Sequence, residues 1–288
     1  MAITYNDLYL DIRRQLRECG VEAATLEARE LVCFGLDKSR EELVRDSRLY
    51  AGTAQERRVR ELVDRRLAGE PVAYLTGEWE FYGLPLDITQ EVLIPRSDTE
   101  VLAEQAIAYV QGLGECRVLD LCAGSGCIGL AVAEKAPNCK VVLGELSDGA
   151  LKICRQNIRR NGLSGRAVPV QADAREQPDQ TLGVFQCIVS NPPYIPSADI
   201  AGLDVSVKDY EPRAALDGGP DGLDFYRSIC ERWKQALIPG GRLYFEVGIG
   251  QADRVLRIMR GQGFGDIQLV DDLGGIPRVV FGTLCTEI

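Results

Sequence analysis

Residues 120–129, with the sequence DLCAGSGCIG, contain three glycines between a strand-like and a helix-like segment. Glycine lets the backbone approach a ligand closely, and the first turn of a helix offers free N–H groups. Glu145 ends the next strand-like segment, where its carboxylate can accept hydrogen bonds from both hydroxyls of a ribose. Asp173 closes a third such segment and is placed to border an adenine. This spacing predicts a site for a nucleoside, whereas the glycines alone would fit any tight turn.

The same stretch disfavours a dinucleotide. The complete G-x-G-x-x-G pattern is missing, and so is the phosphate-binding lysine of a P-loop. A nucleoside with a non-phosphate tail fits better, and S-adenosylmethionine is such a ligand. The pattern D-x-x-x-G-x-G of Asp120, Gly124 and Gly126 resembles motif I of class I methyltransferases. The sequence leaves open whether Asp120 orients the turn or contacts the cofactor.

Residues 191–194, Asn-Pro-Pro-Tyr, follow a short apolar segment. Methylation of a planar NH2 group is difficult because its lone pair is delocalised. Two acceptors that hold both N–H groups turn the lone pair toward the methyl, and their fixed dipoles stabilise the developing charge. Asn191 offers a side-chain oxygen, the stiff backbone aims a carbonyl, that of Pro192, and Tyr194 supplies a flat face. We therefore predict a clamp for a planar NH2 group. The motif alone does not choose between adenine in DNA, guanine in RNA and the glutamine side chain, and a proline-rich strand end is the plain alternative.

The rest of the composition limits the chemistry. The chain has 288 residues, no histidine and ten cysteines, none of them in a C-x-x-C pair, so no metal site is predicted. Most cysteines stand among apolar residues, which predicts reduced, structural thiols. Without histidine the usual general base near neutral pH is missing. The proposed clamp needs none.

Charge and hydropathy indicate the kind of partner. The net charge is −10, and residues 1–70 carry 13 Lys and Arg against 14 Asp and Glu, so most of the negative charge lies further on. This balance disfavours nucleic acid as the main substrate. No stretch is apolar enough for a membrane span, and the first residues lack the order of a signal peptide. We expect a cytoplasmic protein without a membrane partner.

The elements suggest three parts. Residues 1–70 read as a helical bundle, with capping boxes predicted at Ser39-x-x-Glu42 and Thr53-x-x-Glu56. Residues 71–97 read as a β-hairpin linker, broken at Gly83. Residues 98–288 alternate between strands and helices, which predicts a mostly parallel sheet covered on both faces.

Five longer stretches occur in this order: LTGEWEFYGLPLDITQEVLIPRSDTE, LDLCAGSGCIGLAVA, IVSNPPYIP, YEPRAALDGGPDGLDFYR and FEVGIGQ. Together they resemble the HemK/PrmC family, whose members methylate the Gly-Gly-Gln glutamine of peptide chain release factors. The resemblance covers nearly the whole chain. It implies a class I, Rossmann-like methyltransferase domain with a seven-stranded sheet, preceded by the bundle and the hairpin.

The resemblance also implies roles for individual residues. The S-adenosylmethionine bay would be formed by Cys122, Ala123, Gly124, Ser125 and Gly126. Glu145 would bind the ribose, Ala174 would lie beside the adenine, and Asn191 would border both ligands. The glutamine would be held by Asn191, Pro192, Pro193 and Tyr194, in a pocket shaped by Glu211 and Arg213. The family usually has Gly-Thr at Cys122-Ala123, Asp at Glu145 and an aromatic at Ala174.

The bundle and hairpin would then grip a release factor, and no exposed apolar stripe calls for a second subunit, so a monomer is expected. The alternative is a methyltransferase acting on an adenine or guanine amine of nucleic acid, which predicts a basic surface and a target-recognition module. A non-catalytic cofactor-binding protein would be expected to lack the clamp.

Overall fold

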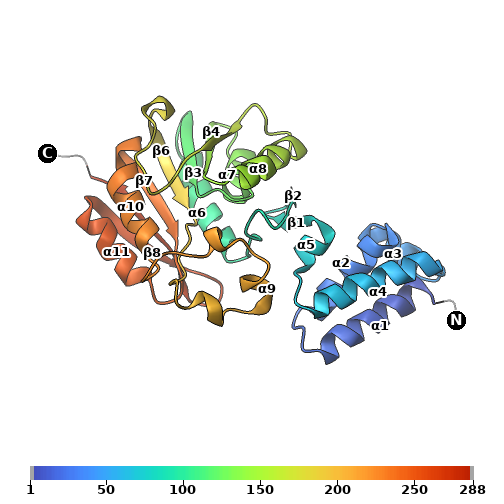
Figure 1. Ribbon diagram of the computed structural model, residues 1–288. Helices are drawn as coiled ribbons and strands as arrows, with labels where there is room; N and C mark the ends of the chain where they lie inside the picture. The colour runs from blue at the N-terminus through green and yellow to red at the C-terminus, as the bar shows by residue number, and fades with distance from the viewer. Residues whose placement is uncertain (1–2, 286–288) are drawn as a thin grey trace. The chain divides into compact units, whose positions relative to one another are not determined.

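The computed structural model describes residues 3–285, and the chain divides into two compact units (Figure 1). The first unit runs to Glu78 and also includes the short segment Val205–Tyr210. The second unit comprises Trp79–Asp204 and the chain from Glu211 onward. Among the described residues, no helix has both the length and the hydropathy required to span a bilayer.

The first unit is built from helices, and the longer ones each bury an apolar side. They are α1 (Tyr5–Glu18), α2 (Ala24–Leu36), α3 (Arg40–Arg45), α4 (Thr53–Leu67), α5 (Val72–Thr76) and α9 (Val205–Lys208). Leu8, Ile12 and Leu16 are fully buried, and their four-residue spacing gives α1 a continuous apolar face. Helices α1 and α4 both pack against α2. The predicted N-terminal helical bundle is confirmed.

The two predicted capping boxes have different outcomes. Ser39 accepts a hydrogen bond from the Glu42 N–H at 3.1 Å and donates its own N–H to the Glu42 carboxylate at 2.9 Å, as predicted. At α4 the prediction is wrong, because the N-cap is Gly52. Its N–H donates to the side chain of Gln55 at 3.0 Å, so the reciprocal bond comes from one residue earlier than expected.

The predicted hairpin is present as β1 (Glu78–Phe81) and β2 (Leu84–Asp87). Its two turn residues, Tyr82 and Gly83, have φ values of 53° and 78°. Two consecutive left-handed residues make the tight hairpin turn that matches the twist of the strands.

The second unit contains a seven-stranded sheet in the order β5-β4-β3-β6-β7-β9-β8. Its strands are β3 (Cys116–Leu121), β4 (Cys139–Glu145), β5 (Ala167–Gln171), β6 (Phe185–Ser190), β7 (Leu237–Glu246), β8 (Phe264–Asp271) and β9 (Pro277–Leu284). The pairs from β5 to β7 are parallel, and β9 lies antiparallel between β7 and β8. This mostly parallel sheet confirms the predicted fold class.

Helices cover both faces of the sheet. They are α6 (Thr99–Gln111), α7 (Cys127–Lys135), α8 (Asp148–Arg160), α10 (Asp224–Arg232) and α11 (Ala252–Gly261), with short 3₁₀ helices η1 (Gln180–Leu182), η2 (Ile200–Gly202), η3 (Arg213–Ala215) and η4 (Trp233–Ala236). Helix α6 packs against α7, and α10 packs against α11. In Figure 1, α7 and α8 lie on one side of the sheet and α10 and α11 on the other.

The strand order reverses at β3. From β3 the chain proceeds outward to β4 and β5, then returns to β6 on the other side and continues to β7. The loops that leave the carboxyl ends of β3 and β6 therefore diverge over opposite faces. In open α/β sheets this divergence creates the crevice in which ligands bind.

One pair of cysteines departs from the prediction of reduced thiols. Cys116 and Cys139 begin the parallel strands β3 and β4, are register partners, and form a disulfide with their Cα atoms 4.8 Å apart. The sequence could not show this pairing, because it depends on the register of two strands. The other eight cysteines are free.

Candidate active site

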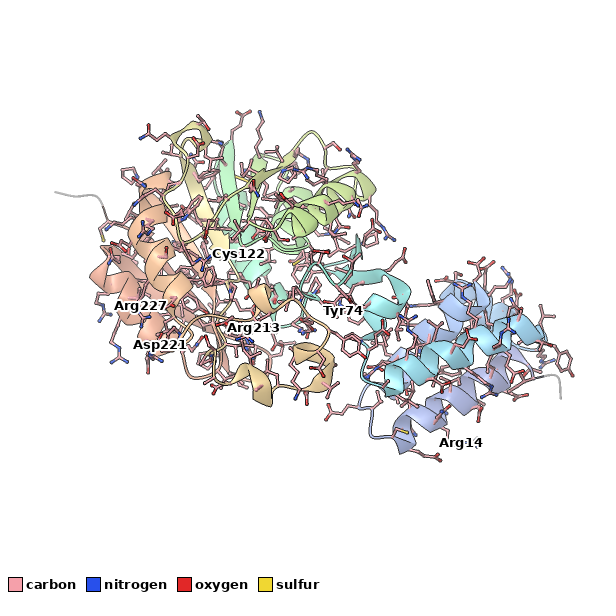
Figure 2. The ribbon with its side chains drawn as sticks, in the orientation of Figure 1. Arg14, Tyr74, Cys122, Arg213, Asp221 and Arg227 are labelled. Atoms are coloured by element: carbon pink, nitrogen blue, oxygen red, sulfur yellow. A yellow bond between two sulfur atoms is a disulfide. The ribbon has the colours of Figure 1, made fainter. Side chains whose placement is uncertain are left out.

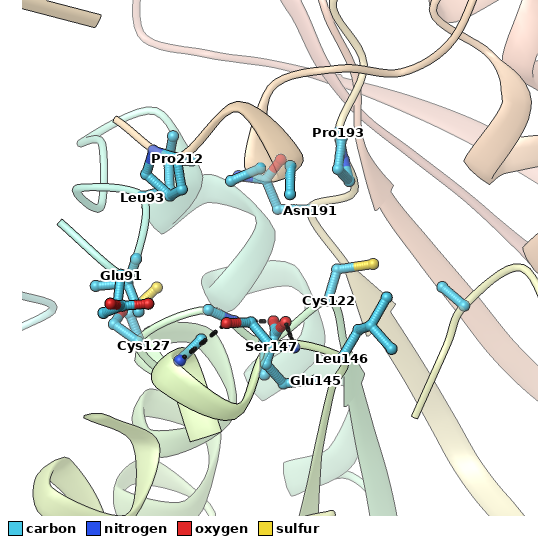
Figure 3. Close-up of a pocket in the computed structure, with 18 of the residues that line it drawn as sticks. Glu91, Leu93, Cys122, Cys127, Glu145, Leu146, Ser147, Asn191, Pro193 and Pro212 are labelled. Atoms are coloured by element: carbon cyan, nitrogen blue, oxygen red, sulfur yellow. Dashed lines mark hydrogen bonds between the residues drawn. The ribbon is translucent and has the colours of Figure 1, made fainter. Parts of the chain in front are cut away.

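A cavity of about 380 Å³ opens at the carboxyl ends of the strands in the second unit (Figure 3). This volume is typical of small-molecule sites. The wall includes nine of the residues predicted from sequence: Cys122, Ala123, Gly124, Ser125, Glu145, Asp173, Ala174, Asn191 and Pro193. Six other predicted residues are described by the structure but lie off this wall: Asp120, Gly126, Pro192, Tyr194, Glu211 and Arg213.

The turn after β3 is built from left-handed backbone. Gly124 and Gly126 have φ values of 55° and 83°, which glycine adopts without strain. Gly126 is the N-cap of α7, and a Cβ atom there would lie 3.1 Å from the Leu143 side chain, so α7 packs closely on β4. Cys122 (Figure 2) is also left-handed, with a φ of 64°. A non-glycine residue pays roughly 1–2 kcal/mol for this conformation.

Glu145 is fixed at the end of β4 by two backbone hydrogen bonds (Figure 3). Its Oε2 accepts from the Gly124 N–H and its Oε1 from the Ser147 N–H, both at 2.9 Å. These bonds join the β3 and β4 loops into one wall. Each carboxylate oxygen keeps a further lone pair, so the side chain can still accept hydroxyl groups from a ligand.

Asp120 lies beneath the turn and does not reach the cavity. It is fully buried, and its Oδ2 accepts a hydrogen bond from the Gly129 N–H at 2.8 Å. Its Oδ1 has no hydrogen-bond partner in the described part of the chain. Burial raises the pKa of Asp120 to about 7. The bond to Gly129 ties β3 to α7, and Asp120 is not among the residues that line the cavity.

An aromatic residue missed by sequence reasoning stands at the predicted adenine end. Asp173 accepts the Arg175 N–H at 2.8 Å, and Ala174 accepts the Ser228 hydroxyl on its carbonyl at 3.0 Å. Phe225, in the first turn of α10, lines the cavity with Ala174, and both belong to one apolar cluster. Phe225 therefore offers a ring surface where Ala174 has none. No role was predicted for it from the sequence, although it stands in the stretch YEPRAALDGGPDGLDFYR, because only the packing of α10 brings it here.

Asn191 stands on the cavity wall directly after β6 (Figure 3). The preceding residue, Ser190, donates its hydroxyl to the Leu121 carbonyl at 2.6 Å, which joins the ends of β6 and β3. The Asn191 side-chain nitrogen donates to the hydroxyl of Thr99 at 3.4 Å. With its nitrogen turned toward α6, the side-chain oxygen is left for the cavity.

The other residues of the NPPY motif pack mainly against the protein interior next to Asn191. Pro192 and Pro193 are buried, and only Pro193 reaches the cavity wall. The Tyr194 carbonyl accepts a hydrogen bond from the Gln251 side chain at 2.9 Å, and burial raises the pKa of Tyr194 to about 12. Its ring packs beside Gly248, where an added Cβ would lie 3.0 Å from the ring.

Glu211 and Arg213 flank the loop that closes one side of the cavity. Glu211 is buried and forms a salt bridge with Arg96, and burial raises its pKa. Arg213 (Figure 2) is exposed and pairs with Asp217 at 3.3 Å. Between and after them, Pro212, Ala214 and Ala215 line the cavity. The two charged residues thus hold the loop and leave the wall itself apolar.

Two thiols border the cavity, those of Cys122 and Cys127. Burial raises the pKa of Cys127 to about 12 and that of Cys122 further. Both thiols therefore stay protonated near neutral pH.

The donor set of the cavity fits S-adenosylmethionine. Glu145 can accept the ribose hydroxyls, and the glycines leave room for the ligand next to the backbone. Ser125 lines the cavity with a buried hydroxyl that has no hydrogen-bond partner among the described residues, so it can serve a polar group at the amino-acid end. Ala174 and Phe225 supply apolar surface for the adenine.

The fold and the site together define a class I S-adenosylmethionine-dependent methyltransferase. Two protein-family models match the chain: the PrmC N-terminal domain over residues 7–77 and the methyltransferase small domain over residues 98–202. The chain is 43% identical over 277 residues to the release factor glutamine methyltransferase of Geobacter sulfurreducens, covering 94% of each chain. It is 36% identical over 257 residues to the enzyme of the same name from Thermodesulfovibrio yellowstonii, covering 88% of this chain and 90% of that one. The chain belongs to the release factor glutamine methyltransferase family.

A solved structure supports the fold assignment. The catalytic domain of hMettl16, in complex with the MAT2A 3′UTR hairpin 6, matches with a TM-score of 0.57 and 16% identity, covering 79% of this chain and 84% of that one. At this identity the likeness concerns the fold alone.

Proposed function

We propose that this enzyme transfers a methyl group from S-adenosylmethionine to the side-chain amide nitrogen of the glutamine in the Gly-Gly-Gln motif of peptide chain release factors. Membership of the family supports the substrate. The observation that carries the chemistry is the placement of Asn191 on the cavity wall, with its nitrogen bonded to Thr99 and its oxygen left for a ligand.

Each end of the cavity has its own task in this proposal. When bound, S-adenosylmethionine supplies the electrophilic methyl group. Glu145 accepts the ribose hydroxyls, and Phe225 with Ala174 borders the adenine. Asp173 lies at the same end of the cavity. Asp120 does not touch the cofactor but holds the turn that carries Gly124 and Gly126.

The substrate amide is proposed to bind between fixed acceptors. The Asn191 oxygen accepts one N–H of the glutamine, and the other is accepted by the backbone carbonyl of Pro192, which is bonded directly to the wall residue Pro193. Both bonds strengthen as the nitrogen acquires positive charge, which is how fixed dipoles lower a barrier. The alkylated nitrogen then loses a proton to water, so no general base is needed. Tyr194 stiffens the motif through its carbonyl bond to Gln251.

We also propose a division of labour along the chain. Residues 1–70 and the hairpin linker 71–97 grip the release factor, and residues 98–288 carry out the transfer. A pocket that encloses one glutamine cannot by itself select a protein, so a separate docking surface has to supply that specificity. The proposal includes a monomeric enzyme that acts in the cytoplasm, as expected from the sequence.

A labelling experiment tests the proposed function. The protein is incubated with methyl-labelled cofactor and one of three acceptors: a release factor, the same factor with its Gly-Gly-Gln glutamine replaced by alanine, or duplex DNA. We expect label on the first acceptor only. Label on DNA would overturn the proposal and favour the nucleic-acid alternative. Label on the substituted factor at the same rate as on the unsubstituted one would also overturn it.

A further inference from the structure

Glu246 carries a buried carboxyl group next to the site, and this group has no role in the proposed function described above. It is the last residue of β7 and only 2% exposed. Strands β6 and β7 are parallel, and Ser190 is paired with Phe245. The next residues along the two strands are Asn191 and Glu246. Because the strands are parallel, these two residues lie next to each other at the carboxyl ends of β6 and β7.

The polar surroundings of Glu246 are few and specific. Against the larger effect of burial, Thr99, Arg278 and the Asn191 side chain all favour the charged form of Glu246 and so lower the pKa of its carboxyl group. Asp98 is the nearby group of like charge. One carboxylate oxygen, Oε2, is buried without a hydrogen-bond partner among the described residues. Glu246 therefore has spare acceptor capacity at a position that the strand register places beside Asn191.

Arg278 is held by other carboxylates. It is 8% exposed and bonds to Asp98 at 3.0 Å and to Asp272 at 3.2 Å. The Glu246 backbone carbonyl accepts the hydroxyl of Tyr226 at 2.9 Å, which fixes the strand end from the opposite face. The side chain of Glu246 is thus left for Thr99 and Asn191.

An asparagine side chain has two nearly equal ends with opposite hydrogen-bonding properties. A half-turn about its last bond would present NH2 to the cavity, where it would repel the N–H groups of the substrate. An ionised carboxylate can only accept hydrogen bonds, so it selects the NH2 end of the amide. The other end, the oxygen, must then face the cavity.

We propose that Glu246 is the positioning residue that fixes the orientation of the Asn191 amide and so directs its oxygen at the substrate. Thr99 assists, because its hydroxyl can accept from Asn191 while donating to Glu246. The inference rests on the proposed function, since it explains how the acceptor of the clamp is aimed. It concerns orientation only, because Glu246 does not line the cavity.

The protonation state of Glu246 gives this role a pH signature. Burial raises the pKa of Glu246 to about 7. A protonated Glu246 can donate a hydrogen bond to the Asn191 oxygen and so favours the reversed amide. The charged groups around Glu246 are Asp98 and Arg278, and the titratable groups nearby are Tyr194, Tyr226 and Cys127. The kcat of the wild-type enzyme should therefore fall as the pH is lowered through about 7.

The test uses Glu246→Gln in the full-length enzyme. Glutamine has the same shape, but its NH2 group can donate to the Asn191 oxygen and so stabilise the reversed amide, while packing is kept. We expect kcat to fall about 10- to 100-fold, because this is the rate ratio that corresponds to the loss of one hydrogen bond to a charged group. Binding of S-adenosylhomocysteine, measured by calorimetry, should be unchanged, and the decline of kcat near pH 7 should disappear.

Asp272→Asn is the matched control. It removes a carboxylate from the same arginine, Arg278, without touching Asn191. Its kcat and pH profile should match those of the wild type. A Glu246→Gln enzyme with wild-type kcat and an unchanged pH profile would overturn the proposal, and so would an equal loss of kcat in the control.

A second readout does not depend on methyl transfer. In protein labelled with ¹⁵N-asparagine, the side-chain NH2 signal of Asn191 is identified by its absence in Asn191→Asp. We expect this signal to shift with a midpoint near pH 7 in the wild type, and not in Glu246→Gln. The absence of such a shift in the wild type would refute the orienting role even if the release factor is methylated. Conversely, the shift together with no methylation would refute only the proposed function.

Discussion

Arg96 and Glu211, which are 115 residues apart in the sequence, form a salt bridge beside the cavity. The Glu211 side chain is 1% exposed, whereas that of Arg96 is 42% exposed. The second Glu211 oxygen is buried without a hydrogen-bond partner in the described residues. A buried carboxylate thus depends on one cation at the surface, and this bond ties the loop that contains Pro212 to the segment that contains Pro95.

Removal of this cation should destabilise the protein. Arg96→Met keeps most of the side-chain length but leaves Glu211 charged, buried and unpaired. We expect a loss of about 1–3 kcal/mol in the free energy of unfolding, less than for a fully buried pair because Arg96 is partly exposed. Urea denaturation at pH 7.5 measures it. The double variant Arg96→Met/Glu211→Gln should regain most of the loss, and equal stability of the single and double variants would contradict this account.

The clamp model makes a sharp prediction for Asn191→Ala. Loss of a fixed polar group directed at developing charge typically costs about 10²- to 10³-fold in rate. We expect that reduction in kcat, measured with labelled cofactor and a release factor, with cofactor affinity changed less than threefold. Asn161→Ala is the control, because it removes an asparagine outside the cavity that bonds to the Pro85 carbonyl. Full turnover by Asn191→Ala would exclude the clamp.

Phe225 should contribute to cofactor affinity although no role was predicted for it from the sequence. Phe225→Ala removes the ring beside Ala174, and we expect the Kd for S-adenosylhomocysteine to rise about 10-fold. Phe225→Leu keeps apolar bulk without the ring and should give an intermediate Kd. Titration calorimetry distinguishes the three proteins. An unchanged Kd for Phe225→Ala would place the adenine elsewhere.

Asp120 should make stability depend on pH. Burial raises its pKa from 3.8 to about 7, so the folded protein binds this proton more tightly than the unfolded chain does. Its stabilising contribution is complete below about pH 4 and is lost as the pH rises through 7. Asp120→Asn cannot titrate. Its stability relative to the wild type should therefore rise by about 2–4 kcal/mol between pH 4 and pH 8.

Urea unfolding of both proteins at several pH values checks this. Glu246 titrates in the same range in both, so the difference between them isolates Asp120. If the difference in stability between the two proteins does not vary with pH, folding does not raise the pKa of Asp120 and this account is wrong.

The sequence predicted those parts of the fold and site that depend on local chemistry. Gly124 and Gly126 adopt left-handed backbone without strain in the turn beside the cavity, and Asn191 follows a strand with a clear apolar pattern. Arg96 and Glu211 stand in two of the five stretches that carry the family resemblance, and the structure joins these stretches by a salt bridge.

What the sequence could not provide depends on tertiary packing. Phe225 reaches the cavity only because α10 packs on the sheet, and Glu246 meets Asn191 only through the register of β6 and β7. The cap of α4 was assigned to Thr53 because its hydroxyl suits that role, but Gly52 with Gln55 forms the bond one residue earlier. The Cys116–Cys139 bond likewise follows from strand pairing.

The two protonated thiols on the cavity wall bear on how the enzyme avoids damage by its own reagent. A sulfonium methyl donor alkylates thiolates readily, and both Cys122 and Cys127 border the cavity proposed to hold it. Nucleophilic attack by cysteine requires the thiolate form. Because burial raises the pKa of both thiols, the thiolate fraction at these two positions is smaller than at an exposed cysteine, and attack on a bound sulfonium is correspondingly disfavoured.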